Sequence, residues 1–287
     1  ITLLYLMSPF QLIMNTISDL SRANVALQRV EALGIELESA GTEGATPSDS
    51  EPGHSPLQIE LIGVTHAYRR EAEEDNFLLG PINMNLASGE LVFLTGGNGS
   101  GKTTLAKLLI GLYVPENGEI RLNGEKITDL NREFYRQHFS VVFSDFFLFE
   151  SLLGLDSPGL DESARSYLSK LQLDHKVKIQ AGAVSTTELS QGQRKRLALM
   201  TAYLEDRPVY IFDEWAADQD PFFKSIFYNH ILPDLKGRGK ALLVISHDDK
   251  YYSVADRIIK LDSGNIDCAA PIGTAQMDGE IAAPIEL

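Results

Sequence analysis

One short run of residues carries the clearest chemical signal in the sequence. Gly96-Gly97-Asn98-Gly99-Ser100-Gly101-Lys102-Thr103 fits the pattern of a glycine, four free positions and then Gly-Lys-Thr. Glycines have no Cβ, so their backbone can wrap closely around an anion and direct its N–H groups at phosphate oxygens. In such a loop Lys102 reaches the β- and γ-phosphates, and the Thr103 hydroxyl is placed to ligate Mg²⁺. The run therefore predicts a site for a nucleoside triphosphate.

The residues on either side of this run are those that a phosphate-binding loop requires. Glu90 to Thr95 is apolar and rich in strand formers, and Thr104 to Gly111 has apolar residues at helical spacing. This order places the loop at the positive end of a helix. A glycine-rich turn that only caps a helix is the alternative, and the agreement at every fixed position favours the phosphate site. We expect the whole loop from Gly96 to Thr104 to bind the nucleotide.

Two neighbouring carboxylates end another apolar run. Val209-Tyr210-Ile211-Phe212 has the character of a buried strand and is followed directly by Asp213 and Glu214. Asp213 suits a Mg²⁺ ligand beside the nucleotide, and Glu214 can accept a proton from the water that attacks the γ-phosphate. Many strands end in acids, so this pattern is informative only beside the phosphate loop. The two patterns in one chain predict an NTPase.

A third motif, Leu189-Ser190-Gln191-Gly192-Gln193, precedes the acidic strand and opens a predicted helix. A serine and a glycine at a helix N-terminus form an anion site. An ordinary helix cap is the alternative, because Ser190 is a good N-cap and Gln193 stands where a capping box requires it. Beside the other two motifs, the run resembles the signature sequence of ATP-binding cassette (ABC) proteins, whose usual form is Leu-Ser-Gly-Gly-Gln.

The resemblance to ABC proteins covers about residues 57–267 and implies roles for further residues. Tyr68 stands where the family has an aromatic residue that stacks on adenine, and a core aromatic at a strand end is the alternative. His247 follows an apolar strand and matches the histidine that contacts the γ-phosphate, although a lone histidine is by default structural. Asp220 matches an acidic residue that crosses to a partner cassette.

ABC proteins bind ATP and Mg²⁺ between two cassettes, so the resemblance implies a head-to-tail pair of copies. The glycine loop of one copy is expected to hold ATP, and Ser190, Gly192 and Gln193 of the second copy to cover its γ-phosphate. Glu214 is expected to polarise the attacking water while Lys102 and the histidine hold the developing charge.

The sequence departs from the usual ABC pattern at three places. Ser144 stands where the family has a glutamine that reaches Mg²⁺ or the lytic water, and a serine side chain is shorter. Trp215-Ala216-Ala217-Asp218-Gln219 replaces the usual Pro-Thr-Ser-Ala-Leu. The stretch between Ser144 and the signature is short, which predicts a reduced helical subdomain. At these positions, above all in residues 212–221, the sequence resembles that of bacterial exporters of cyclic peptides and peptide siderophores, of the pyoverdine- and syringomycin-exporter type.

That resemblance implies a membrane domain before the cassette on the same chain, at the cytoplasmic face of the bacterial inner membrane, and a peptide or siderophore precursor as cargo. Residues 1–14 form an apolar run, shorter than the ~20 residues that a membrane helix needs. The run fits either the cytosolic end of a membrane helix or a buried amphipathic helix, and by itself favours neither. We expect residues 1–38 to be the end of the last transmembrane helix and an amphipathic helix, with the upstream part missing.

Composition and pattern set the fold class and the domain boundaries. The 287 residues carry a net charge of −15, which argues against a nucleic-acid-binding surface, and the single cysteine excludes an intrachain disulfide. Residues 39–56 are dense in Gly, Ser and Pro and are predicted to be a flexible linker. Residues 57–267 are the predicted ABC domain, and residues 268–287 a loosely ordered tail.

Strands alternate with helices along the domain, which predicts an α/β fold: a P-loop NTPase core with a mostly parallel sheet, an antiparallel β layer and a small helical subdomain. The predicted strands are 57–65 and 77–86 in the antiparallel layer, then 90–95, 119–123, 139–143, 208–212, 241–245 and 257–261. The predicted helices are 104–111, 161–171, 194–204 and 221–235.

Three other functions compete with the exporter interpretation. A soluble ABC ATPase of chromosome maintenance would carry a long coiled coil that residues 104–188 cannot hold, and one acting in translation would carry two cassettes. An importer's separate cassette subunit would start near Leu57, without an apolar segment before it. A nucleotide-gated interaction module that moves no cargo is the third.

Overall fold

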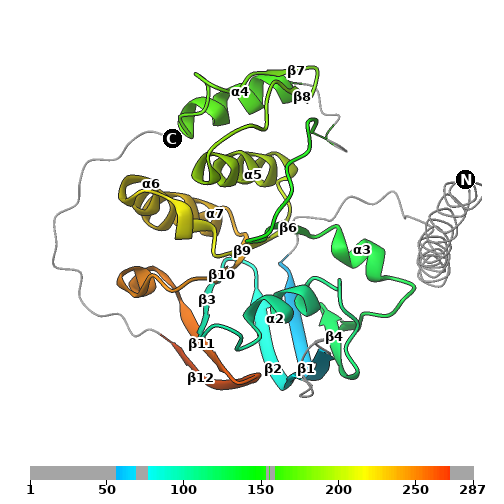
Figure 1. Ribbon diagram of the computed structural model, residues 1–287. Coiled ribbons are helices and arrows are strands. Elements are labelled where there is room, and N and C mark those ends of the chain that lie inside the picture. The colour runs from blue at the N-terminus through cyan, green and yellow to red at the C-terminus, as the bar shows by residue number, and fades with distance from the viewer. Residues whose placement is uncertain (1–55, 69–76, 153–154, 156–158, 272–287) are drawn as a thin grey trace, which may run out of the picture. The chain divides into compact units, whose positions relative to one another are not determined.

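The computed structural model describes residues 56–68, 77–152, 155 and 159–271 (Figure 1). All of them belong to one unit of the chain, Pro47–Leu287. The predicted membrane-proximal segment 1–38, the linker up to residue 55 and the tail from residue 272 lie outside the described residues. Among the helices that the structure describes, none is both long enough and apolar enough to cross a bilayer.

A six-stranded sheet forms the centre of the fold, in the order β12-β11-β3-β10-β9-β6. All neighbouring strands run parallel except β12, which is antiparallel to β11. Every residue of β9 and β10 is buried, as expected for parallel strands that are covered on both faces. The strands are β3 (Leu91–Gly96), β6 (Phe139–Val142), β9 (Val209–Asp213), β10 (Ala241–Ile245), β11 (Arg257–Asp262) and β12 (Asn265–Pro271).

A second, antiparallel sheet has the order β2-β1-β4-β5. Buried and exposed residues alternate along much of β2, so one face of this sheet packs on the core and the other faces solvent. The predicted antiparallel layer is therefore confirmed, although β1 extends beyond residue 65. The strands are β1 (Gln58–Tyr68), β2 (Phe77–Ala87), β4 (Asn117–Leu122) and β5 (Glu125–Lys126).

Each face of the central sheet has its own hydrophobic core, because successive side chains of a strand point to opposite faces. Val92 and Leu94 of β3 pack with the antiparallel layer and with α2 (Lys102–Leu109). Leu91 and Phe93 pack on the other face, with α5 (Gln191–Glu205) and the helices that follow β9. β3 is thus fixed from both sides, and so is the loop that leaves its carboxyl end.

Helices lie on both sides of the central sheet, with α2 on the side of the antiparallel layer and α5, α6 and α7 on the other (Figure 1). α4 packs against α5 beside the small hairpin of β7 and β8. α4 is the only helix among the residues described between β6 and α5, so the helical subdomain is small, as predicted. The remaining elements are α3 (Arg132–Arg136), α4 (Leu160–Lys170), α6 (Pro221–Ile226), α7 (Leu232–Gly237), β7 (Ile179–Gln180) and β8 (Ala183–Val184).

The helix predicted over 221–235 is present as a continuous helical run, but a π-helical turn, Phe227–Ile231, separates α6 from α7 within it. Pro233 has no N–H to donate to the carbonyl four residues earlier, which favours such an irregularity. The domain continues beyond residue 267, because Cys268 to Pro271 pair with β11 in the backbone ladder rather than belonging to a loose tail.

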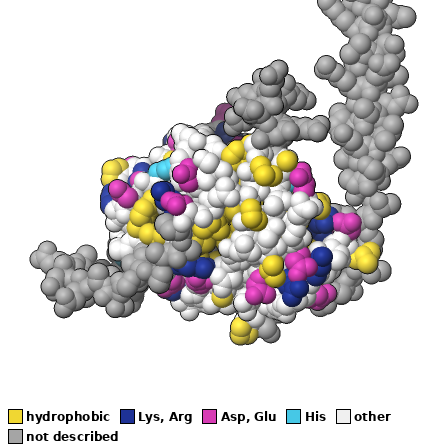
Figure 2. Space-filling model, turned by 90° about the horizontal axis from the view of Figure 1, so that it is seen from below, with side chains coloured by type: hydrophobic (Ala, Val, Ile, Leu, Met, Phe, Trp, Pro, Cys, Tyr) yellow, Lys and Arg dark blue, Asp and Glu magenta, His cyan; other side chains and the backbone are white. Residues whose placement is uncertain are grey.

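Acidic and basic side chains are interspersed on the face that lies below in Figure 1 (Figure 2). On β4 of the antiparallel sheet, Glu119 pairs with Arg121, and at 3.2 Å it pairs with Lys126 of β5. These pairs lower the pKa of the Glu119 carboxyl, with the hydrogen bond from Arg121 as the largest cause. Exposed pairs of this kind contribute little to stability.

Candidate nucleotide-binding site

The glycine loop joins the carboxyl end of β3 to the N-terminus of α2, as the sequence predicts. Gly96 has a φ of 148°, and a Cβ on it would lie 2.1 Å from the carbonyl oxygen of Leu261 on β11, so no other residue fits. Gly101 has a φ of 102° and precedes the first helical residue, Lys102. The ammonium of Lys102 lies over the loop, 3.0 Å from the carbonyl oxygens of both Gly96 and Gly97.

A cavity of about 430 Å³ opens at this loop. Its volume is in the range of small-molecule sites in proteins. The N-terminus of α2 forms one wall, so backbone N–H groups and the positive end of the helix face any anion inside it. The residues that line the cavity are Phe77, Asn98, Gly99, Gly101, Lys102, Thr103, Thr104 and Glu214.

Asp213 and Thr103 come together beside this cavity. The Thr103 hydroxyl donates a hydrogen bond of 2.9 Å to Oδ2 of Asp213, whose side chain is almost entirely buried. Burial is the largest cause that raises the pKa of the Asp213 carboxyl, and the charges of Glu214 and Asp145 raise it further; the Thr103 hydrogen bond and the charge of Lys102 lower it. A buried carboxylate that lies near two other acidic groups gains from a divalent cation.

These oxygen atoms fit Mg²⁺. A hydroxyl and a carboxylate are the ligands that Mg²⁺ takes in nucleotide sites, where phosphates and water complete the shell. Among the described residues no cluster of three or more His, Cys, Asp and Glu side chains is placed to hold a metal alone. Ser144 is exposed two residues after β6, the strand that neighbours β9, so it lies at the same edge of the sheet as Asp213.

Glu214 and His247 meet at the carboxyl ends of neighbouring strands. Asp213 pairs with Ile245 in the register of β9 and β10, and the N–H of Glu214 donates to the carbonyl of Ile245 at 3.0 Å. This bond brings Oε1 of Glu214 to 3.5 Å from Nε2 of His247. Both side chains are partly exposed, 37% and 50% respectively, so water can reach the space between them.

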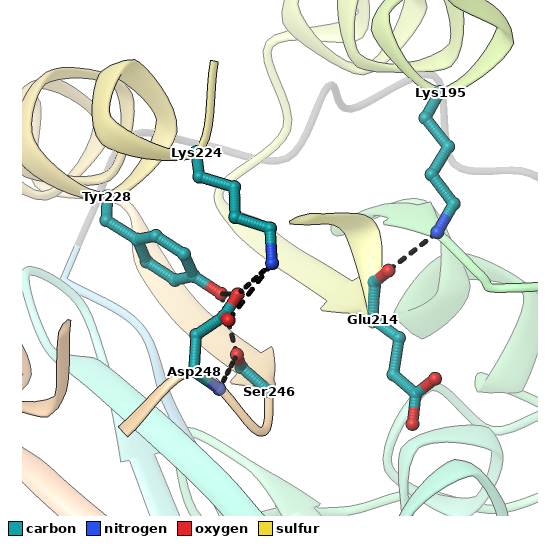
Figure 3. Close-up of polar contacts among 6 residues, drawn as sticks. All are labelled: Lys195, Glu214, Lys224, Tyr228, Ser246 and Asp248. Atoms are coloured by element: carbon teal, nitrogen blue, oxygen red, sulfur yellow. Dashed lines mark hydrogen bonds and ion pairs between the residues drawn. The ribbon is translucent and has the colours of Figure 1, made fainter. Parts of the chain in front are cut away.

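A partly buried hydrogen-bond network among Lys224, Tyr228, Ser246 and Asp248 (Figure 3) holds the turn that carries His247. The hydroxyl of Tyr228 lies 2.6 Å from Oγ of Ser246 and donates at 3.1 Å to Oδ2 of Asp248. The ammonium of Lys224 binds both oxygens of Asp248, at 3.0 and 3.2 Å. Burial, the largest cause, raises the pKa of the Tyr228 hydroxyl, which therefore stays protonated. The residues on both sides of His247 are thus fixed from the helical segment of residues 221–231.

Ser190 caps α5 in the way that the alternative interpretation predicts. The N–H of Gln193 donates to Oγ of Ser190 at 3.4 Å, and the N–H of Ser190 donates to Oε1 of Gln193 at 3.2 Å, which is a capping box. A capped helix N-terminus still presents N–H groups to an anion. Neither Ser190, Gly192 nor Gln193 is among the described residues that line the cavity of their own chain.

Comparison with known proteins decides the family. The family model described as ABC transporter matches residues 79–217, from β2 to the turn after Glu214. This chain contains an ABC transporter nucleotide-binding domain. The predicted family is therefore confirmed, and with it the ABC-type fold.

Individual relatives agree with this assignment. The chain is 47% identical to the ATP-binding protein SyrD of Pseudomonas syringae pv. syringae, over 93% of this chain and 48% of SyrD. It is 31% identical to the ATP-dependent lipid A-core flippase of Alkalilimnicola ehrlichii, over 84% of this chain and 44% of the flippase. The chain thus spans about half the length of the curated relatives it matches.

A solved structure shares the fold. It is the structure of a bacterial Atm1-family ABC exporter with ATP bound, which superposes with a TM-score of 0.66 at 20% identity. The superposition covers 84% of this chain and 43% of the exporter chain.

The cavity has one lining residue that sequence reasoning missed. Tyr68, the predicted stacking residue, ends β1 and pairs in register with Phe77, the first residue of β2. Phe77 itself lines the cavity and lies within 3.1 Å of where a Cβ on Gly101 would be. Its place as the first residue of the predicted strand 77–86 was the available signal.

Asp145 and Asp220 complete the comparison of predicted and observed positions. Asp145, beside Ser144, was not predicted to belong to the site, yet its charge reaches Asp213 and raises the pKa of that carboxyl. Asp220 caps α6: its Oδ1 accepts from the N–H groups of Phe222 and Phe223, both at 3.0 Å. Its predicted crossing to a partner cassette stays a prediction.

Proposed function

We propose that this chain is the ATP-hydrolysing part of a membrane ABC exporter. The observation that carries the proposal is the convergence of Thr103, Asp213 and Glu214 at the cavity of the glycine loop, with His247 3.5 Å from Glu214. A phosphate-binding loop supplies binding, a hydroxyl and a buried carboxylate supply metal ligands, and a partly exposed carboxylate beside a histidine supplies a base for water.

Different residues of this chain have different roles in the proposed hydrolysis. The loop N–H groups and Lys102 bind the triphosphate and hold the charge that develops on the γ-phosphate. Thr103, Asp213 and, by resemblance, Ser144 would hold Mg²⁺, which when bound neutralises the β- and γ-phosphate oxygens. Glu214 orients the attacking water and accepts its proton, and the His247 imidazole stabilises the γ-phosphate from the other strand end.

The site is completed by a second copy of the chain in this proposal. The signature residues Ser190, Gly192 and Gln193 do not line the cavity of their own chain, and in this proposal they cover the nucleotide of a partner. The capped N-terminus of α5 would then add its N–H groups and dipole to the γ-phosphate. ATP thereby joins two cassettes head to tail, and hydrolysis separates them.

The exporter assignment is supported by the relatives and by the departures from the common ABC sequence. The chain corresponds to about half of SyrD and of a lipid A-core flippase, which leaves room in such proteins for a membrane domain. We infer that the membrane domain is on the same full-length chain, at the cytoplasmic face of the bacterial inner membrane. The cargo we propose is a cyclic peptide or a peptide siderophore precursor. An importer subunit or a soluble ABC ATPase is the alternative.

Three measurements test the proposal. Purified protein should release phosphate from Mg²⁺-ATP, and Lys102→Ala should lose nucleotide affinity in a binding titration. Inverted membrane vesicles that contain the full-length protein should take up a candidate peptide only with hydrolysable ATP. A folded chain that binds no adenine nucleotide would overturn the whole proposal, whereas ATP hydrolysis without peptide uptake or peptide-stimulated turnover would overturn only the exporter part.

A further inference from the structure

Lys195 is a buried lysine on the helix that the signature opens. Its side chain is only 2% exposed. The ammonium donates at 2.6 Å to the backbone carbonyl of Glu214 and lies 2.7 Å from Oδ2 of Asp218 (Figure 3 shows the first contact). A buried charge is tolerated only where it is paired and hydrogen-bonded, so Lys195 cannot leave these two partners cheaply.

The segment that departs from the usual ABC sequence is bonded to α5 by three of its residues. Besides the Asp218 pair, Nε1 of Trp215 donates to the carbonyl of Lys195 at 2.8 Å. Nε2 of Gln219 donates to the carbonyl of Gly192 at 2.9 Å. A Cβ on Gly192 would lie 2.8 Å from the carbonyl oxygen of Asp218, so the two segments are also in close van der Waals contact.

The backbone at Glu214 needs to be held from outside. Glu214 has φ 51° and ψ 34°, a left-handed conformation that residues with a Cβ adopt only where surrounding contacts fix it. Its N–H is held by Ile245 at 3.0 Å, and its carbonyl is held by Lys195. With the peptide groups on both sides fixed, the carboxylate points away from Lys195 (Figure 3), and Glu214 lines the cavity.

We infer that Lys195 is a positioning residue for hydrolysis: its ammonium joins the signature helix α5 to the carbonyl of Glu214 and so sets where the base stands. The inference rests on the proposed function, because it requires Glu214 to act on water at the γ-phosphate. In a head-to-tail pair, the same contact links the helix that covers the partner's nucleotide to the base of its own site.

Lys240 provides a matched control. It is also a buried lysine, with its side chain 7% exposed, and it donates at 2.9 Å to the backbone carbonyl of Asp206 and pairs at 3.0 Å with the Asp206 carboxylate. Asp206 is left-handed as well, with φ 48°. Lys240 precedes the first residue of β10, at the end of the sheet opposite the cavity. Lys195→Met and Lys240→Met therefore remove the same kinds of contact at two different places.

The experiment compares steady-state ATP hydrolysis by the whole 287-residue chain and its two methionine variants. Both variants should melt at lower temperature, and rates are corrected for the folded fraction. We expect Lys195→Met to lower kcat about tenfold or more, the size expected for a lost charge-assisted hydrogen bond, with KM for ATP within about threefold of the parent. Lys240→Met should keep kcat within about twofold. Each variant lowers kcat by some factor relative to the parent. If the factor for Lys195→Met is less than about five times the factor for Lys240→Met, the inference is overturned.

A second pair covers the case in which Lys195→Met does not fold. The carboxylates of Asp218 and Asp206 are 45% and 43% exposed, so Asp218→Asn and Asp206→Asn should both be tolerated. Asp218→Asn weakens the anchor of Lys195 and should lower kcat at least about threefold more than Asp206→Asn does; equal values would refute the role of Lys195. If the parent chain itself neither binds nor hydrolyses ATP, the proposed function has failed; if the parent turns over and the variants match their controls, only this inference has failed.

Discussion

Tyr228 and Tyr210 are both fully buried, and replacing each by phenylalanine should change the stability of the fold in opposite directions. The Tyr228 hydroxyl bonds to Ser246 at 2.6 Å and to Asp248 at 3.1 Å. The Tyr210 hydroxyl is buried and has no hydrogen-bond partner among the described residues. Replacing tyrosine by phenylalanine removes only the hydroxyl and leaves the ring packing, so the difference between the two variants isolates the hydrogen bonds.

The size of each stability change depends on whether removal of the hydroxyl leaves a hydrogen-bond partner unsatisfied. After Tyr228→Phe, Asp248 still has Lys224 at 3.0 Å and Ser246 still accepts the N–H of Asp248 at 3.0 Å, so no partner is left bare. We expect a loss of about 1–2 kcal/mol in the free energy of unfolding, which is about 2–8 °C in Tm. Tyr210→Phe removes an unsatisfied buried group and should gain about 1 kcal/mol, or about 2–4 °C.

Function separates the two variants as well. His247 stands between Ser246 and Asp248, so a looser turn after Tyr228→Phe should lower kcat for ATP hydrolysis by about threefold to tenfold. Tyr210→Phe should leave kcat unchanged. Differential scanning calorimetry and phosphate release on the same preparations measure both effects. Equal destabilisation by the two substitutions, or an unchanged Tm in Tyr228→Phe, would refute this account of the network.

Three further predictions concern the site itself. Glu214→Gln should lower kcat by about 10²–10⁴-fold while ATP binding is kept and a nucleotide-bound dimer accumulates in size-exclusion chromatography; normal turnover would contradict the base assignment. Burial raises the pKa of Asp213 above its ordinary 3.8, so the stability linked to this group is present in acid and is lost as the pH rises through the raised value. Asp213→Asn should therefore raise the nucleotide-free Tm at neutral pH but not in acid, and should abolish the Mg²⁺-dependent rise in Tm with ATP; thermal melts that show no pH dependence of the difference would count against it. Gly96→Ala should abolish ATP binding in a calorimetric titration, because its Cβ would lie 2.1 Å from the Leu261 carbonyl, and retained micromolar binding would show that the loop can shift.

The glycine loop, the acidic strand and the signature helix could be predicted because their requirements are local. Gly96 and Gly101 adopt backbone conformations that few other residues tolerate, and Ser190 and Gln193 cap a helix by themselves. Continuous apolar runs such as β9 are typical of strands that are buried on both faces. Such features leave a mark in consecutive residues, so the sequence shows them directly.

Other features leave no local mark. Pro233 favours an irregularity in the predicted helix, but the π-helical turn before it brings the Tyr228 hydroxyl to Ser246, a contact that depends on how the helix packs on β10. The pairing of Cys268 to Pro271 with β11 depends on a free sheet edge. Phe77 reaches the cavity because the antiparallel layer folds back over the loop.

The sequence alone determined that this chain carries a phosphate-binding loop, a pair of carboxylates at a strand end and a serine-capped signature helix, because spacing and residue type suffice for each. Only the tertiary structure decided that β9 and β10 are neighbours, which places Glu214 3.5 Å from His247, and that Lys195 binds the carbonyl of Glu214. Those contacts join residues that are 33 and 19 positions apart in the chain, and their distance is set by the order of strands and the packing of α5, which no run of neighbouring residues encodes.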